Sequence, residues 1–168
     1  MTENATTPFW RFSLNFYRQT GVSDACIALQ DGCGVDVNLL LFLVWLASEG
    51  RQVSPQEVKT FDDGVRSWRE LTIVPIRDTR RKLKGAATLV DPGQQEAFRN
   101  KVKAVELEAE QLQQEALYNF TKSGPLGTRA APRDAARANV AAYAGALGQD
   151  FPRGAVDLLA AAFDALAG

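Results

Sequence analysis

The sequence predicts an all-α fold: a single-domain multi-helix bundle around a buried central helix, followed by a C-terminal Ala-rich helical hairpin. Three observations carry this prediction. Apolar residues recur at spacings of three and four along most of the chain, and Ser, Thr or Asp before Pro marks several helix starts. The one strand-like run, "LTIVPI", is interrupted by Pro75, so we expect no strand.

The first two helices follow from local start signals. Thr7 can cap a helix that has Pro8 at its first position and three phenylalanines on one face, and Gly21 is expected to close it. Ser23 can cap a second, short helix that stops at the glycine-rich turn "DGCG".

The third helix is the predicted centre of the bundle. Asp36 fits its N-cap, the helix runs from Val37 to about Glu49, and Gly50 follows as the terminating glycine. Nothing from Leu39 to Ala47 is polar, which is about half the length needed to cross a bilayer. The run therefore predicts a helix buried on all sides and not a membrane span.

Three more helices complete the bundle. The stretch "SPQE", Ser54 to Glu57, is a capping box that begins the fourth helix, which Asp62, Asp63 and Gly64 can kink. Pro75 is expected to open a separate fifth helix. Asp91 and Pro92 begin the longest one, which runs to about Phe120 with apolar residues at alternating spacings of four and three.

The composition changes after the bundle, which we place at residues 1–122. Residues 123–132 contain glycine and proline and are the predicted linker. Residues 133–168 are predicted to form the helical hairpin, and 15 of the 39 residues from Ala130 onward are alanine. Because alanine buries little area, this hairpin is expected to be loosely attached.

The composition also limits the possible functions. There is no histidine, which removes the commonest general base and metal ligand, and we assign no catalytic residue, cofactor or metal. The net charge of −1 provides no general attraction to nucleic acid or to an anionic membrane, and neither is expected as a partner. No secretory signal precedes the first helix, and the two cysteines fit no metal or redox spacing, so a cytoplasmic location with reduced thiols is expected.

A basic stripe is the leading candidate site. Arg77, Arg81 and Lys84 share one side of the fifth helix, with Arg80 beside them. The stripe can bind an anionic ligand or an acidic partner surface, because arginine offers a bidentate fork. The alternative is purely structural pairing with the acidic residues of the long helix, Glu106, Glu108, Glu110 and Glu115.

A second candidate polar site is formed by Asp31, Asp36 and Asn38. Carboxylate and amide oxygens can hold a hard cation, but the spacing does not match a calcium loop, and capping and turn formation explain both aspartates. Asn38 enters an apolar helix, and a buried polar contact that fixes helix register is the simpler explanation. The many aromatic residues are expected to form the core; a hydrophobic ligand pocket is the alternative.

One long composite pattern resembles a known family. The segments "FWRFSLNFYRQTGVSDACIALQDGCGVDVNLLLF" and "PIRDTRRKLK", within about residues 9–120, are similar to a small, mostly proteobacterial family described as a domain of unknown function. The resemblance implies a compact helical cytoplasmic protein. It supplies no reaction, cofactor or catalytic residue.

Two functions of different class are consistent with these features. The first is a non-enzymatic binding or adaptor protein that docks a partner protein, or a second copy of itself, through its charged helix faces. The alternative is a small helical enzyme or carrier that binds a phosphate- or carboxylate-bearing ligand through the basic stripe, with or without the assistance of a metal ion, and that uses Asp31 or Asp36 as base or metal ligand.

Overall fold

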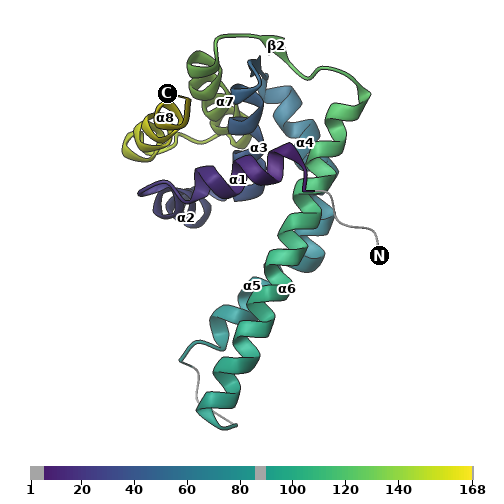
Figure 1. Cartoon of the computed structure of the whole chain (residues 1–168), viewed down its shortest axis with the longest axis vertical. Helices are drawn as coiled ribbons and strands as arrows, with labels where there is room; N and C mark the ends of the chain where they lie inside the picture. Colours follow the sequence, from purple (N-terminus) through teal and green to yellow (C-terminus); the bar gives the residue numbers. More distant parts are fainter. Residues whose placement is uncertain (1–5, 86–89, 168) are drawn as a thin grey trace.

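The computed structural model describes residues 6–85 and 90–167, and these residues are predominantly helical, which confirms the predicted all-α class. Figure 1 shows a rounded head from which two helices, α5 and the first part of α6, project as a long arm. The first five residues, on which the expectation of no secretory signal partly depends, lie outside the described residues.

The elements are named in chain order. The helices are α1 (Pro8–Tyr17), α2 (Val22–Cys33), α3 (Val37–Ser48), α4 (Pro55–Trp68), the π-helix η1 (Arg69–Ile73), α5 (Val74–Lys82), α6 (Pro92–Asn119), the 3-10 helix η2 (Phe120–Ser123), α7 (Pro132–Leu147) and α8 (Arg153–Ala167). The strands are β1 (Arg51–Gln52) and β2 (Thr128–Arg129).

Helix α3 is the centre of the head, as predicted. Every residue from Asn38 to Ala47 is buried, and α1, α6 and α7 pack around the helix. Asp36 caps its N-terminus by accepting bonds from the backbone N–H groups of Asn38 at 2.9 Å and Leu39 at 3.4 Å. None of the helices in the described ranges combines the length and apolar character that crossing a bilayer requires.

The ends of α1 and α2 differ from the prediction. Helix α1 ends at Tyr17, and Gly21 begins α2 instead of closing α1, with a left-handed φ of 80°. Helix α2 starts before Ser23 and continues through the expected turn to Cys33, because its final turn is completed by Gly34 and not by the glycine at 32.

The fourth and fifth helices form one continuous helical run, which corrects the prediction of a break before Pro75. The capping box at Ser54 and Glu57 is present. The wider π-helical turn of η1 ends at Ile73, two residues before Pro75. The proline ring would clash with an ordinary helical turn, but the wider turn accommodates it, and the helix continues. Gly64 lies where α4 meets η2: a Cβ at this position would come within 2.6 Å of the Phe120 ring.

Helix α6 follows its predicted bounds closely, with Asp91 as N-cap, and contributes to both head and arm. Two bonds tie it to the neighbouring helical run along the arm. The Trp68 indole donates to the carbonyl of Ala109 at 2.9 Å, and the Gln95 amide donates to the carbonyl of Leu83 at 2.8 Å.

The expectation of no strand was wrong, although the sheet is very small. Strands β1 and β2 pair in antiparallel fashion, so the segment 123–132 is fastened to the head. The Arg51 guanidinium donates to the carbonyls of Leu126 and Gly127 at 2.6 and 3.0 Å. A Cβ at Gly127 would come within 2.2 Å of the carbonyl oxygen of Gln52, so only glycine permits this approach.

The C-terminal hairpin packs into the same core, which corrects the expectation of a loose attachment. Helix α7 packs directly on α3, and Val140 and Tyr143 are part of the main apolar cluster. The fully buried Asn139 accepts from Val53 N–H at 2.8 Å and donates to the carbonyls of Leu43 and Arg51 at 2.9 and 3.0 Å. These bonds satisfy the backbone where β1 crosses the end of α3.

Candidate functional site

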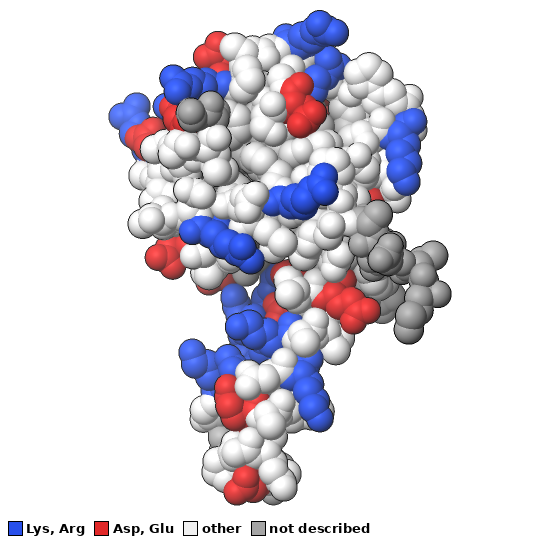
Figure 2. Space-filling model, viewed as in Figure 1, with Lys and Arg blue, Asp and Glu red and all other residues white. Residues whose placement is uncertain are grey.

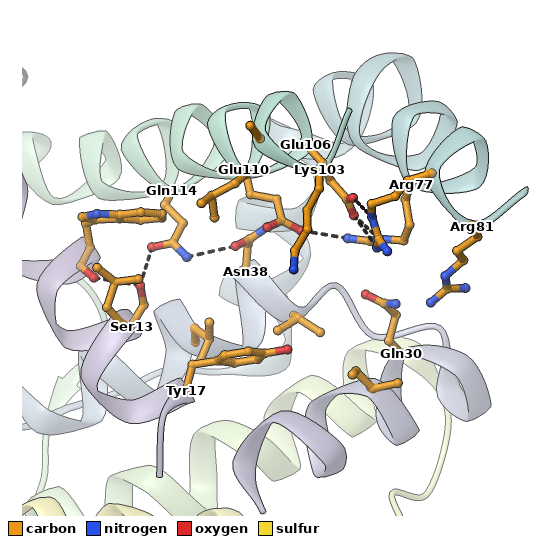
Figure 3. A pocket seen from close by; sticks show the side chains of 18 of the residues that line it. Ser13, Tyr17, Gln30, Asn38, Arg77, Arg81, Lys103, Glu106, Glu110 and Gln114 are labelled. Carbon is orange, nitrogen blue, oxygen red and sulfur yellow. Dashed lines mark hydrogen bonds and ion pairs between the residues drawn. The ribbon is translucent and has the colours of Figure 1, made fainter. Parts of the chain in front are cut away.

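A cavity of about 710 Å³ lies in the angle between the head and the arm. Its walls come from α1, α2 and α3 on the head side and from α5 and α6 on the arm side (Figure 3). This volume falls within the range of small-molecule sites in proteins.

One wall of the cavity is largely apolar. It contains Trp10 and Leu14 from α1 and Val37 and Leu41 from α3, and Leu107 of α6 adds an apolar side chain on the arm side. Trp10 therefore lines the cavity, whereas Phe9, Phe16 and Phe42 belong to the closed core, as expected for most of the aromatic residues.

The opposite wall carries three arginines of the predicted basic stripe, and two of them, Arg77 and Arg80, are held by glutamates of α6. Arg77 binds Glu106 at 3.1 Å and Glu110 at 3.0 Å, and Arg80 binds the Glu106 carboxylate with both Nε and a terminal nitrogen. The acidic and basic helix faces thus meet within one chain. Lys84, also predicted in this stripe, is exposed and does not line the cavity.

The two glutamates have opposite pKa shifts. Burial works against ionisation of Glu106, but the bonds and charges of Arg80 and Arg77 outweigh it and lower the pKa of this carboxyl. At Glu110 burial dominates and raises the pKa, and the charge of Glu106 adds to the rise although Arg77 opposes it. A carboxyl group with a raised pKa in a cavity is typical of functional sites.

Two further cationic side chains line the cavity and are not held by a close ion pair. Arg81 makes only a long contact of 3.5 Å with Asp31, and both side chains are about half exposed. Lys103 points from α6 into the cavity, towards Tyr17 and Gln30 (Figure 3), and none of the ion pairs among the described residues uses it. Figure 2 shows lysine and arginine side chains gathered where the arm leaves the head.

The charged side chains lining the cavity are therefore predominantly positive. Arg77, Arg80, Arg81 and Lys103 supply four positive charges, against two carboxyl groups from Glu106 and Glu110. The cavity has an excess of two positive charges when both glutamates are ionised, and a larger one when Glu110 is protonated.

A chain of buried polar side chains forms the inner end of the cavity. The Ser13 hydroxyl donates to the Gln114 side-chain oxygen at 2.9 Å, and the Gln114 amide nitrogen donates to Asn38 at 2.9 Å. Asn38 thus finds a polar partner on another helix. It links α3 to α6 while lining the cavity.

The candidate polar residues Asp31, Asp36 and Asn38 make different contacts. Asp31 lies on the surface of α2 beside Arg81. Asp36 is buried: it caps α3, binds Arg69 at 2.7 Å and accepts a bond from Gln113. All these bonds of Asp36 are internal to the fold.

Arg69 is a partner of Asp36 that the sequence did not indicate, and it does not line the cavity. It bridges Asp36 at 2.7 Å and Asp62 at 2.8 Å. Burial opposes its charge, but the two aspartates outweigh this and raise its pKa. Because Asp36 and Arg69 are 33 positions apart and belong to different helices, no local spacing identifies the pair.

A periodic signal along α6 marks part of the cavity lining. Glu106, Glu110 and Gln114 recur at spacings of four, which places their polar side chains on one face of the helix, the face that lines the cavity. A long helix whose inward face is polar indicates a polar interface or site.

The described residues suggest no metal centre. They contain no group of three or more Cys, Asp and Glu side chains arranged to hold a metal ion. Cys26 and Cys33 are buried and not bonded to each other, and burial raises the pKa of the Cys26 thiol to about 12, so this cysteine stays protonated at neutral pH.

Comparison with known protein families gives a match over most of the chain. Residues 8–117 match a family model with the description "Protein of unknown function (DUF2390)". The matched region ends within α6 and includes both walls of the cavity, from α1 to Gln114. Searches of curated proteins and of solved structures returned no match.

Proposed function

The chain belongs to the DUF2390 family, and because this family's function is unknown, we propose a function from the site itself: a non-enzymatic protein that binds an anionic small molecule with an apolar body. The observation that carries the proposal is the cavity between head and arm, which joins an apolar wall to cationic side chains. The anionic group belongs to the chemical class of carboxylates and phosphates.

The size and lining of the cavity support a small-molecule ligand. Its volume of about 710 Å³ fits a ligand of some tens of atoms, and ligand sites combine apolar walls with a few polar groups that fix orientation. Trp10, Leu14 and Leu41 supply the apolar contact, and Ser13, Asn38 and Gln114 supply the polar end.

The distribution of charge supports an anionic group. Arg77 and Arg80 are held in place by Glu106, while Arg81 and Lys103 have donors left for a ligand. An anion between these two side chains offsets the positive charge of the site.

Docking of a partner through the charged faces is less well supported. The most buried members of the basic stripe, Arg77 and Arg80, already bind the acidic side chains of α6. Only the outer residues, Arg81 and Lys84, remain accessible to a protein surface. We assign no catalytic role, because Asp36 is occupied by internal bonds.

A fluorescent anion provides the direct test. 8-Anilinonaphthalene-1-sulfonate combines aromatic rings with a sulfonate, and its fluorescence rises in an apolar site. We expect saturable binding that dodecanoate displaces and that dodecanol, which has the same chain without the charge, displaces at least tenfold less well. Absence of saturable binding, or equal displacement by both compounds, would contradict the proposal.

Two lysines on the same helix give a matched pair of variants. Lys103→Ala removes the cation that points into the cavity, and Lys101→Ala removes an exposed cation outside its lining. We expect Lys103→Ala to weaken dodecanoate binding about tenfold and Lys101→Ala to leave it unchanged. Equal effects would indicate general electrostatic attraction and not binding in the cavity.

A further inference from the structure

The arm carries most of the exposed large apolar side chains of the described residues. In the run formed by α4, η1 and α5 these are Trp68, Leu71 and Val74. On α6 they are Phe98, Val105, Leu107 and Leu112. An accumulation of exposed apolar residues on a projecting element is a feature of association surfaces.

Three of these residues form a line along α6, which we call the outer stripe: Phe98, Val105 and Leu112. They are 56%, 51% and 43% exposed and stand seven residues apart, which is two helical turns each. Ala116 and Asn119 continue the same line and are also exposed, so no described residue covers this side of α6.

The outer stripe lies opposite the cavity. Leu107, two positions after Val105, lines the cavity, and two residues correspond to about 200° around a helix. A partner on the outer stripe and a ligand in the cavity therefore occupy different sides of α6.

A charged pair borders the outer stripe on one side. Lys101 follows Phe98 by three residues, and Glu108 follows Val105 by three, so both lie beside the stripe. Both side chains are exposed, and neither takes part in an ion pair within the described part of the chain.

We propose that the outer stripe of α6 binds the same stripe of a second copy in antiparallel orientation, centred on Val105. In this arrangement Val105 faces its own copy, and Phe98 of each chain packs against Leu112 of the other. Lys101 of each chain then reaches Glu108 of the other on the same side of the interface. The two-fold symmetry therefore gives two pairs of opposite charge.

The shape of the molecule fits this arrangement. The antiparallel orientation sends the two heads to opposite ends, and the exposed line that continues through Ala116 and Asn119 faces the first turn of α6 of the other chain. Trp68, bonded to the Ala109 carbonyl and partly exposed, widens the apolar surface beside the stripe. Because the stripe is short, the expected dimer is weak and dissociates on dilution.

Sedimentation of the full chain tests the assembly. We expect a reversible monomer–dimer equilibrium for the natural sequence, and at least a tenfold weaker one for Val105→Glu, which places two carboxylates face to face. Leu166→Glu is the matched control, because it changes an exposed leucine of α8 in the head and should leave the equilibrium unchanged. A natural chain that remains monomeric at every concentration would overturn the proposal.

Charge reversal tests the orientation without disturbing apolar contacts. Glu108→Lys puts two lysines at each end of the interface and should weaken the dimer several-fold, and adding Lys101→Glu should restore it. A double variant as weak as the single one would overturn the antiparallel pairing.

Cysteine crosslinking is an independent test of the antiparallel orientation. Oxidation should link Val105→Cys chains through residue 105. It should not link Phe98→Cys chains, whose positions lie about 21 Å apart in the antiparallel dimer. Crosslinking at both positions would indicate a parallel pair and overturn the proposal.

Discussion

At the scale of single residues, Asp36 connects more of the molecule than any local pattern suggests. Its carboxylate caps α3 and binds Arg69 and Gln113, while its backbone N–H donates to the Tyr143 hydroxyl at 2.9 Å. One side chain and its own amide therefore link helices α3, α6 and α7 with η1. A buried carboxylate with this many donors is stable only because each of them satisfies part of its charge.

Removing this carboxylate should cost more than removing an ordinary helix cap. We expect Asp36→Ala to lower the free energy of unfolding by about 3 kcal/mol, because it leaves Arg69 with one partner and Gln113 without one. Asp91→Ala, which removes a single exposed cap bond at the start of α6, should cost about 1 kcal/mol. Urea unfolding followed by circular dichroism measures both, and equal losses would show that Asp36 acts only as a cap.

At the scale of elements, the arm is held together by charge as well as by apolar contact. Glu106 is the central acceptor, because Arg77 and Arg80 both bind it from α5. Exposed ion pairs contribute little to stability, but these three side chains are mostly buried, so the loss of one partner leaves a charge that water cannot easily reach.

The stability of the arm should therefore decrease at low pH. The pKa of Glu106 in the folded protein lies below its ordinary value of 4.5, so its contribution is present above that value and is lost as the pH falls through the folded pKa. The pKa of Asp62 is also lowered: burial opposes the shift, and bonds from Arg66 and Arg69 outweigh it, so Asp62 acts in the same sense.

Urea unfolding at pH 7 and pH 3 separates the contribution of Glu106. We expect the natural chain to lose more stability between these values than Glu106→Gln, which has no charge to lose at this position. Glu70→Gln is the control, since Glu70 is exposed and makes no ion pair within the described ranges, and its pH dependence should match that of the natural chain. An unchanged pH dependence in Glu106→Gln would contradict the role of this pair.

At the scale of the whole molecule, the family match and the folded unit have different limits. The match covers residues 8–117, whereas the core of the head includes Val140, Tyr143, Leu159 and Phe163 from the last two helices. The hairpin therefore covers apolar surface of α3 that the matched part leaves open.

This difference gives a prediction about truncation. A chain that ends at residue 131 should fail to unfold cooperatively and should bind hydrophobic dyes without saturation, because the α7-facing side of α3 is exposed and Val53 N–H loses its bond to Asn139. Thermal unfolding followed by near-ultraviolet circular dichroism checks it. A cooperative transition in the truncated chain would show that the matched region folds alone.

The sequence predicted the elements better than the site, and particular residues show why. Asp36, Ser54 and Asp91 mark helix starts, because the groups they cap lie within three positions along the chain. All three act as N-caps, as predicted. The cavity and the bond between Asp36 and Arg69 depend on how distant helices pack, which no spacing along one helix encodes. The helical run through Pro75 was missed because a proline signals a break unless the preceding turn is widened.

That widened turn, η1, has a consequence for the direction in which the arm's charges point. A π-helical turn holds one residue more than an α-helical turn, so it acts as a one-residue insertion between α4 and α5. Deleting one residue from it would rotate everything that follows by about 100° and carry Arg77 and Arg80 away from Glu106. The electrostatics of the arm are thus set by a count of residues as much as by their identity.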